Sequence, residues 1–194
     1  MAYVILGLLV AFGPQTIYSL NKFFEAGISL FYAASLGALR QSLTRLLADD
    51  WVSVEDRPDG KRMKRVYSVT ESGVEAFRAW MVGSIEDRRL ETIALAKLYL
   101  LGTLPDRSDR VAALESIVDR VRADEAVLLD VAPQVAQAHV PDELREVAGY
   151  QRLTLEYGLR SHALAREFFE ELLAAEVGAQ ATTGATDAGA DPAA

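Results

Sequence analysis

The order of local patterns between residues 35 and 80 constrains the fold of this 194-residue chain more than any other feature. Apolar residues recur at helical spacing from Leu36 to Leu46. Two short segments, residues 51–55 and 66–69, then alternate apolar and polar side chains as half-buried strands do. A Pro-Asp-Gly turn separates them, and Thr70 is placed to cap a further helix. Helix, strand, turn, strand and helix in this order predict a winged helix-turn-helix.

The first helix of this unit has the composition of a helix that reads DNA. We expect Ser35 to cap it and Leu36, Leu39, Leu43 and Leu46 to form its buried face. The opposite face combines small residues, which let a helix backbone approach DNA, with amide and guanidinium groups, which pair with base edges. Its members are Gly37, Ala38, Arg40, Gln41, Thr44 and Arg45. An ordinary solvated helix face is the alternative interpretation.

The turn between the two strands is strongly basic. Residues 57–65 hold one carboxylate and five cations, so their local charge is +4. On a hairpin that follows a candidate recognition helix, such cations are expected to contact phosphates, as a wing does. These cations are Arg57, Lys61, Arg62, Lys64 and Arg65. A solvated loop is the alternative.

The residues before this unit predict two more helices. Ala2 to Phe12 is almost wholly apolar, too short to cross a bilayer, and without the basic region and cleavage site of a signal peptide. A helix that is apolar all round suggests contact with a second subunit as well as with its own core. After Gly-Pro, Thr16 can cap a short helix that leaves Tyr18 and Lys22 available for phosphates.

Several stretches together resemble the PadR-like transcriptional regulators, in their longer subfamily with a helical C-terminal domain. They are Ile5–Leu9 with Gly13-Pro14, Tyr18–Lys22, Phe31–Ser35, Leu43–Leu46 and Arg65–Gly73 leading to Trp80. The resemblance spans residues 3–176. It implies a dimeric DNA-binding regulator whose terminal helices embrace the partner's N-terminal domain, and control by a small aromatic effector.

Two positions depart from the family's usual pattern. Arg40-Gln41 stands where the family usually has Tyr-Pro, and Asp50 stands where it usually has Gly before the first wing strand. Because Arg and Gln are competent readers of base edges, the DNA-binding role is compatible with the first change. The operator sequence of other members is not carried over to this chain.

The C-terminal half is acidic and helical. Residues 1–80 have a net charge of +1 and residues 81–194 of −9, so the overall charge of −8 says little about the DNA-facing part. Helices are predicted over residues 88–103, 107–138 and 142–176, the second with a heptad seam interrupted by Glu125. The last has two apolar faces, one through Leu155 and Leu159 and the other through Leu153, Tyr157, Leu164 and Phe168. Dimerisation is the expected role, and an independent protein-interaction module is the alternative.

Catalytic and metal chemistry have little support. The chain has no cysteine, and its two histidines, His139 and His162, lack the spacing of a metal motif. Gly-rich phosphate loops are also missing from the sequence. We therefore expect no enzyme activity, no cofactor and no metal, and a cytoplasmic protein.

These observations combine into one prediction. The chain is expected to be mainly α with a small β-hairpin: a winged helix-turn-helix DNA-binding domain over residues 1–84, a coiled-coil-like dimerisation domain over 85–177 and a disordered tail over 178–194. Its expected function is that of a homodimeric repressor on a two-fold symmetric double-stranded operator. The alternative is a winged helix that contacts proteins and does not bind DNA.

Overall fold

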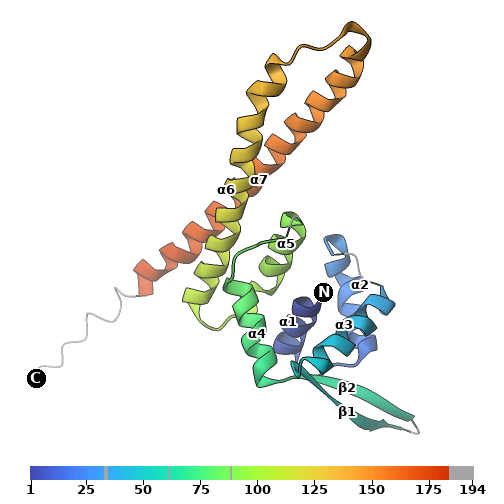
Figure 1. Ribbon diagram of the computed structural model, residues 1–194. Coiled ribbons are helices and arrows are strands. Elements are labelled where there is room, and N and C mark those ends of the chain that lie inside the picture. Colours follow the sequence, from blue (N-terminus) through green and yellow to red (C-terminus); the bar gives the residue numbers. More distant parts are fainter. Residues whose placement is uncertain (33–34, 61, 88, 184–194) are drawn as a thin grey trace, which may run out of the picture. The chain divides into compact units, whose positions relative to one another are not determined.

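The computed structural model describes residues 1–32, 35–60, 62–87 and 89–183, with side chains described up to Gly178. The chain divides into two compact units, residues 1–113 and residues 114 onward. It is mainly helical with one antiparallel hairpin, which confirms the predicted fold class (Figure 1). Within the described residues, no helix is both long and apolar enough to cross a membrane.

The first unit is built around α1, Ala2–Phe12. Val4 to Leu9 are buried, and Gly7 lies so close to Leu100 and Phe77 that even a methyl group there would collide with them. The apolar composition of α1 was predicted to need a second subunit as well as its own core. In the structure the same chain already buries the centre of this helix. Its apolar composition is therefore no longer a reason to expect contact with a second subunit.

The helices α2, Ile17–Ala26, and α3, Leu36–Ala48, form the helix-turn-helix, with the short 3-10 helix η1, Ile28–Leu30, after α2. Both begin at the predicted caps: Thr16 Oγ1 accepts from the Ser19 backbone N–H and Ser35 Oγ from that of Ala38. Three of the leucines predicted to form the buried face of α3 are buried in the structure: Leu39, Leu43 and Leu46. The prediction for Leu36 was wrong: it is 41% exposed, because this first residue of α3 lies at the edge of the core.

The hairpin strands are longer than predicted. β1 spans Val52–Asp59 and β2 spans Arg62–Val69, paired from Val52 opposite Val69 to Asp59 opposite Arg62. Most of the basic stretch predicted as a turn is therefore strand, and Gly60, with a φ of 63°, lies at the turn. Glycine adopts this left-handed conformation without steric cost, so the chain can reverse tightly here.

The helix α4, Glu71–Val82, follows the hairpin and packs closely against its base. Thr70 caps it as predicted, with Oγ1 accepting from the Gly73 N–H at 3.1 Å. Asp50, which departs from the family's usual glycine, has a φ of 55°. Aspartate is one of the few residues that tolerate this conformation, which explains how the chain turns from α3 into β1 without glycine.

The first unit is completed by α5, Leu90–Leu100, the 3-10 helix η2, Leu101–Thr103, and the first turns of α6, Arg107–Gln137. Lys97 in α5 is fully buried and donates from Nζ to the Gly83 carbonyl at 2.6 Å, with the Trp80 ring centroid at 5.9 Å. Burial lowers the pKa of Lys97 to about 8. The folded protein therefore releases this proton at lower pH than the unfolded chain does.

This lysine makes stability depend on pH. Between pH 8 and 10.5 the unfolded state binds more protons at Lys97, so the unfolding free energy rises with pH in this window. Relative to a Lys97→Met variant, we expect the wild-type protein to gain about 1–3 kcal/mol from pH 8 to 10.5. Denaturant titrations of both proteins at several pH values measure this difference. A difference that stays constant with pH would contradict a strongly shifted lysine.

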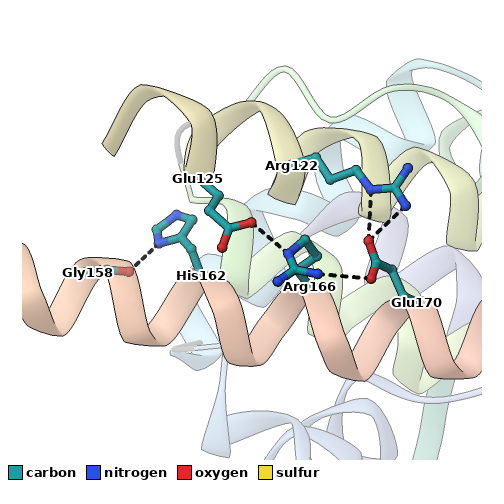
Figure 2. Close-up of polar contacts among 6 residues, drawn as sticks. All are labelled: Arg122, Glu125, Gly158, His162, Arg166 and Glu170. Atoms are coloured by element: carbon teal, nitrogen blue, oxygen red, sulfur yellow. Dashed lines mark hydrogen bonds and ion pairs between the residues drawn. The ribbon is translucent and has the colours of Figure 1, made fainter. Parts of the chain in front are cut away.

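The second unit is a helical hairpin in which α6, from Leu114 on, runs antiparallel beside α7, Arg145–Thr183, with the 3-10 helix η3, Asp142–Leu144, between them (Figure 1). Glu125, predicted to interrupt the apolar seam of α6, accepts a 2.8 Å hydrogen bond from Arg166 Nε of α7. Glu170 joins the same network, 2.8 Å from Arg122 Nη2 and 3.2 Å from Arg166 Nη1 (Figure 2). The charged residue in the seam is therefore paired across the two helices.

The ends of the second unit differ from the predictions in detail. Helix α7 reaches Thr183, so residues 178–183 are helical where disorder was predicted. Residues 184–194 lie outside the described residues. The predicted domain boundary after residue 84 stays a prediction. In the structure α5, which follows that boundary, packs on α1 and belongs to the first unit.

Candidate nucleic-acid interface

The exposed face of α3 carries the residues predicted to read bases. Gly37, Arg40, Gln41, Thr44 and Arg45 are all exposed, and Ala38 is half-buried. A Cβ atom on Gly37 would meet only the Ser35 hydroxyl, at 3.7 Å, so the surface around this glycine is open. The face thus begins with small residues and continues into longer polar side chains, the combination that a helix entering the major groove requires.

Two hydroxyl groups on α3 are already engaged by its backbone. Ser35 Oγ accepts from Ala38 N at 3.2 Å, and Thr44 Oγ1 donates to the Arg40 carbonyl at 3.0 Å. Ser35, at the start of this helix, is exposed and borders the predicted reading face. Because a hydroxyl also accepts, Thr44 retains the capacity to accept a hydrogen bond. Gln41 and Arg45 have longer polar groups and extend the reach of the face.

The helix α2 adds a cation beside α3. Lys22 Nζ lies 4.9 Å from the centroid of the Tyr18 ring, one turn earlier on the same exposed face. Tyr18 is 67% exposed, so its hydroxyl and the lysine are both accessible. This cation–π contact holds the ammonium group over the ring, which limits the entropy that the lysine loses on binding a phosphate.

The wing cations lie on both faces of the hairpin. Residues directly opposite in an antiparallel pair share a face, so Arg57, Lys64 and Arg62 lie on one face with Glu55 and Asp59. Arg65 lies on the other face opposite Asp56, with its guanidinium carbon 5.8 Å from the Tyr67 ring centroid. Lys61, also predicted as a phosphate contact, lies outside the described residues. The hairpin therefore presents positive charge on two sides.

Sequence reasoning missed that carboxylates accompany two of these cations. Arg57 Nη2 lies 3.0 Å from Glu55 Oε2, and Lys64 Nζ lies 3.6 Å from Asp59 Oδ2. Both pairs are well exposed, and exposed pairs of this kind contribute only about 0–1 kcal/mol. A phosphate can therefore replace either carboxylate at little cost. The strand register, in which Glu55 and Arg57 are i and i+2 on one face, was the available signal for the first pair.

Other chemistry finds no support in the part of the chain that the structure describes. His162 Nδ1 lies 2.8 Å from the Gly158 carbonyl, which it can donate to within α7. Among the described residues, no group of three or more histidine, aspartate or glutamate side chains is placed to hold a metal ion. The arrangement that the structure does bring together is the exposed α3 face, the exposed α2 face and the basic hairpin.

The first unit is thus a winged helix-turn-helix of the kind found in transcriptional regulators. Residues 5–79 match the model of the transcriptional regulator PadR-like family. The resemblance noted in the sequence is thereby confirmed. No curated protein matches the chain.

Solved structures of PadR-like regulators are among those to which the chain is similar. Bacillus subtilis PadR in complex with operator DNA is 18% identical and covers 89% of this chain and 97% of its own, with a TM-score of 0.41. The PadR-like transcriptional regulator BC1756 from Bacillus cereus is 21% identical, covering 91% and 98%, with a TM-score of 0.39. Bacillus subtilis PadR in complex with p-coumaric acid is 18% identical, covering 90% and 94%, with a TM-score of 0.38.

Proposed function

We propose that this protein is a cytoplasmic homodimeric repressor that binds a two-fold symmetric operator. In this proposal α3 reads bases through Arg40, Gln41, Thr44 and Arg45, with Gly37 and Ala38 allowing close approach. Tyr18, Lys22, Ser35 and the wing cations Arg57, Lys61, Arg62, Lys64 and Arg65 contact phosphates and position the helix. The observation that carries the proposal is the exposed polar face of α3 next to a basic hairpin in a PadR-like domain.

Whether Gln41 reads the DNA sequence can be tested by comparing affinities for operator DNA and for random DNA. A Gln41→Ala variant should lose about 1–3 kcal/mol on the operator and much less on random DNA, because an amide that pairs with a base edge discriminates between bases. Lys64→Ala is the matched control and should weaken both DNAs alike. Fluorescence anisotropy titrations give the four affinities. Equal losses on both DNAs for Gln41→Ala would remove this residue from the list of readers.

Dimerisation is supported by an apolar face on α7 that its own chain leaves uncovered. Tyr150, Leu153, Tyr157, Leu164 and Phe168 lie on one side of the helix and are 46–74% exposed. The opposite side faces α6, with Gly158 next to Leu128 and Phe169 buried. An exposed apolar strip of this length marks an interface, and a second copy of the chain is the proposed partner.

A carboxylate placed in that strip tests the dimer. Leu164→Glu should convert the dimer to monomers, because it would bury an unpaired charge in the interface. Arg152→Glu also adds a carboxylate to the surface of α7 but away from the strip, and should leave the dimer intact. Analytical ultracentrifugation distinguishes the two forms. A wild-type protein that is monomeric at micromolar concentration would exclude this part of the proposal.

We also propose that a small aromatic effector releases the protein from DNA, as the family resemblance implies. The tight cluster of Tyr3, Trp51 and Trp80 is core packing, with Tyr3 and Trp80 stacked at 5.2 Å. No residue set is assigned to the effector. A panel of aromatic acids, screened for loss of DNA binding by the purified protein, tests this step, and a panel without effect would argue against it.

A further inference from the structure

The outer half of the wing is charged except for one pair of side chains. From the Asp56–Arg65 pair to the turn, all described residues of both strands are exposed. Apart from Gly60 at the turn, these residues are charged, with the exception of Pro58 and Met63. Met63 is 63% exposed. A single exposed apolar residue on a protein surface is normal, but a pair of them within a charged arm suggests a function.

Pro58 and Met63 lie side by side. They are directly opposite each other in the hairpin. Both backbone groups of Tyr67 bond to Gln15, at 2.8 Å and 2.9 Å, so the pair Val54–Tyr67 exchanges no hydrogen bonds within the hairpin. Because the two kinds of pair alternate, Pro58–Met63 on the same face is also a non-hydrogen-bonded pair, as the missing N–H of proline requires. Side chains approach each other most closely in such pairs, so these two form one surface, the apolar tip.

Cations surround the apolar tip. Arg62 and Lys64 are the neighbours of Met63 in β2, and Arg65 lies on the same face as Met63, with Asp56 opposite it. A partner that fits this surface must offer apolar groups next to negative charge. The minor groove of DNA has this chemistry, because phosphates line its edges and apolar side chains such as methionine and proline are known to insert into it.

The base of the wing is fastened to the end of α3. The Trp51 N–H donates to the Leu46 carbonyl at 2.9 Å, and the Thr70 N–H donates to the Trp51 carbonyl at 3.1 Å. Thr70 Oγ1 and Ser72 Oγ both donate to the Asp50 carbonyl, at 2.7 Å and 2.9 Å. Both strands are therefore held next to the proposed reading helix. With α3 in the major groove, the groove adjacent to the wing is the minor groove.

We propose that Met63, supported by Pro58, is an apolar wedge that enters the minor groove beside the segment read by α3 and makes the protein select A·T pairs there. This inference rests on the proposed function and adds a residue that determines specificity. It concerns the first unit alone, so it applies to each half-site separately.

The selection of A·T pairs follows from the shape of the groove. The minor groove of B-DNA is about 6 Å wide, and a G·C pair places the guanine amino group on its floor, where A·T leaves room. An unbranched and polarisable methionine side chain adapts to such a narrow apolar space. A guanine amino group would occupy the same space, and the wedge has no acceptor to pair with it.

The first test locates Met63 in the complex with DNA. The chain has three methionines, of which Met81 is fully buried in the core. In full-length protein labelled with ¹³C at the methionine methyl groups, we expect nuclear Overhauser contacts from the Met63 methyl to deoxyribose protons and to the adenine C2 proton, which lies in the minor groove. Met81 serves as the internal reference without contacts to DNA. Met63 contacts to thymine methyl groups, or no Met63 contacts to DNA, would overturn the inference.

The second test varies the minor groove without changing the segment read by α3. Three operators carry only A·T, only inosine·cytosine or only G·C over about five base pairs, half a helical turn, on either side of each half-site. Inosine·cytosine presents the major groove of G·C but lacks the guanine amino group in the minor groove. The wild type should bind the first two alike and lose about tenfold or more on the third.

Variants of the apolar tip assign this preference to Met63. In Met63→Ala the loss on G·C should shrink to about twofold, the remainder coming from cations that favour narrow A·T grooves. Met63→Leu keeps an apolar wedge and should retain the preference, as should Val74→Ala, which removes another exposed apolar side chain from the same unit.

The failures of the two proposals are distinguishable. An operator-binding wild type without the G·C loss, or an unchanged loss in Met63→Ala, would overturn the wedge and leave the proposed function standing. A wild type that binds no DNA would overturn both.

Discussion

Reversing three charges on the wing should reduce DNA affinity by about 10³-fold or more. Arg62, Lys64 and Arg65 are exposed on the two faces of the hairpin, and each change to glutamate replaces a phosphate contact with repulsion. Because these contacts release counterions, the affinity that remains should also depend less steeply on salt. Titrations of the Arg62→Glu, Lys64→Glu, Arg65→Glu protein on operator DNA at two salt concentrations measure both effects.

The control must separate lost contacts from a damaged hairpin. In the reversed protein, glutamates at positions 62 and 65 would face Asp59 and Asp56 across the strands, and like charges in such positions destabilise a hairpin. Replacing the same three residues with glutamine removes the cations without this repulsion. We expect an intermediate loss of affinity and a melting curve close to that of the wild type.

The same variant separates the two classes of function. If the winged helix serves protein contacts alone, regulation in cells should survive the reversed wing largely intact. If the protein acts on DNA, regulation should disappear together with binding.

Replacing Gly73 with alanine should destabilise the first unit by about 3 kcal/mol or more. A Cβ atom at this position would lie 2.0 Å from the Trp51 carbonyl oxygen and 2.9 Å from the carbonyl carbon. Both are backbone atoms at the junction of α3 and β1, so α4 would have to move away from the hairpin. Overpacking against backbone atoms, which cannot move aside as a flexible side chain can, causes the larger losses of stability among overpacking substitutions.

Gly102 provides the matched control for this change. It belongs to the same unit, but a Cβ atom there would meet nothing within 4 Å. Gly102→Ala should therefore leave stability within about 0.5 kcal/mol of the wild type. Urea unfolding followed by circular dichroism compares the three proteins, and a Gly73→Ala variant as stable as Gly102→Ala would contradict the close packing of α4.

The caps and stops in the sequence predicted the helices of the first unit closely. Thr16, Ser35 and Thr70 all cap helices in the structure, and Gly13-Pro14 ends α1 where expected. These signals are local, since each depends on hydrogen bonds within about one turn. Features that depend on neighbours from elsewhere in the chain were harder to predict.

The β1–β2 hairpin and the apolar seam of α6 show why features that depend on distant residues are harder to predict. Pro58 and Asp59 have poor strand propensity, yet they lie in β1 because the tight turn at Gly60 pairs them with Met63 and Arg62. Glu125 looks like an interruption until Arg166, 41 residues later, is seen to face it (Figure 2). Neither partner is visible in the local pattern, because strand register and helix pairing are set by the fold.

For the proposed DNA interface, some sequence predictions were correct and others were wrong. Helical periodicity placed Gln41 and Arg45 on the exposed side of α3, as the structure has them. Periodicity also placed Leu36 in the core, but this first residue of the helix lies at the edge of the core and is 41% exposed. The carboxylates beside Arg57 and Lys64 were missed because the basic stretch was counted as a turn, in which no register relates one side chain to another.

The central claim is that this winged helix reads a specific DNA sequence, and selection of genomic fragments by the purified full-length protein tests it most directly. We predict enrichment of a palindromic site that binds with nanomolar affinity at physiological salt and weakens steeply as salt is raised. The claim would be contradicted if the selected fragments shared no sequence and the protein bound them all weakly and equally. This result would have to hold both with and without the aromatic acids of the effector panel.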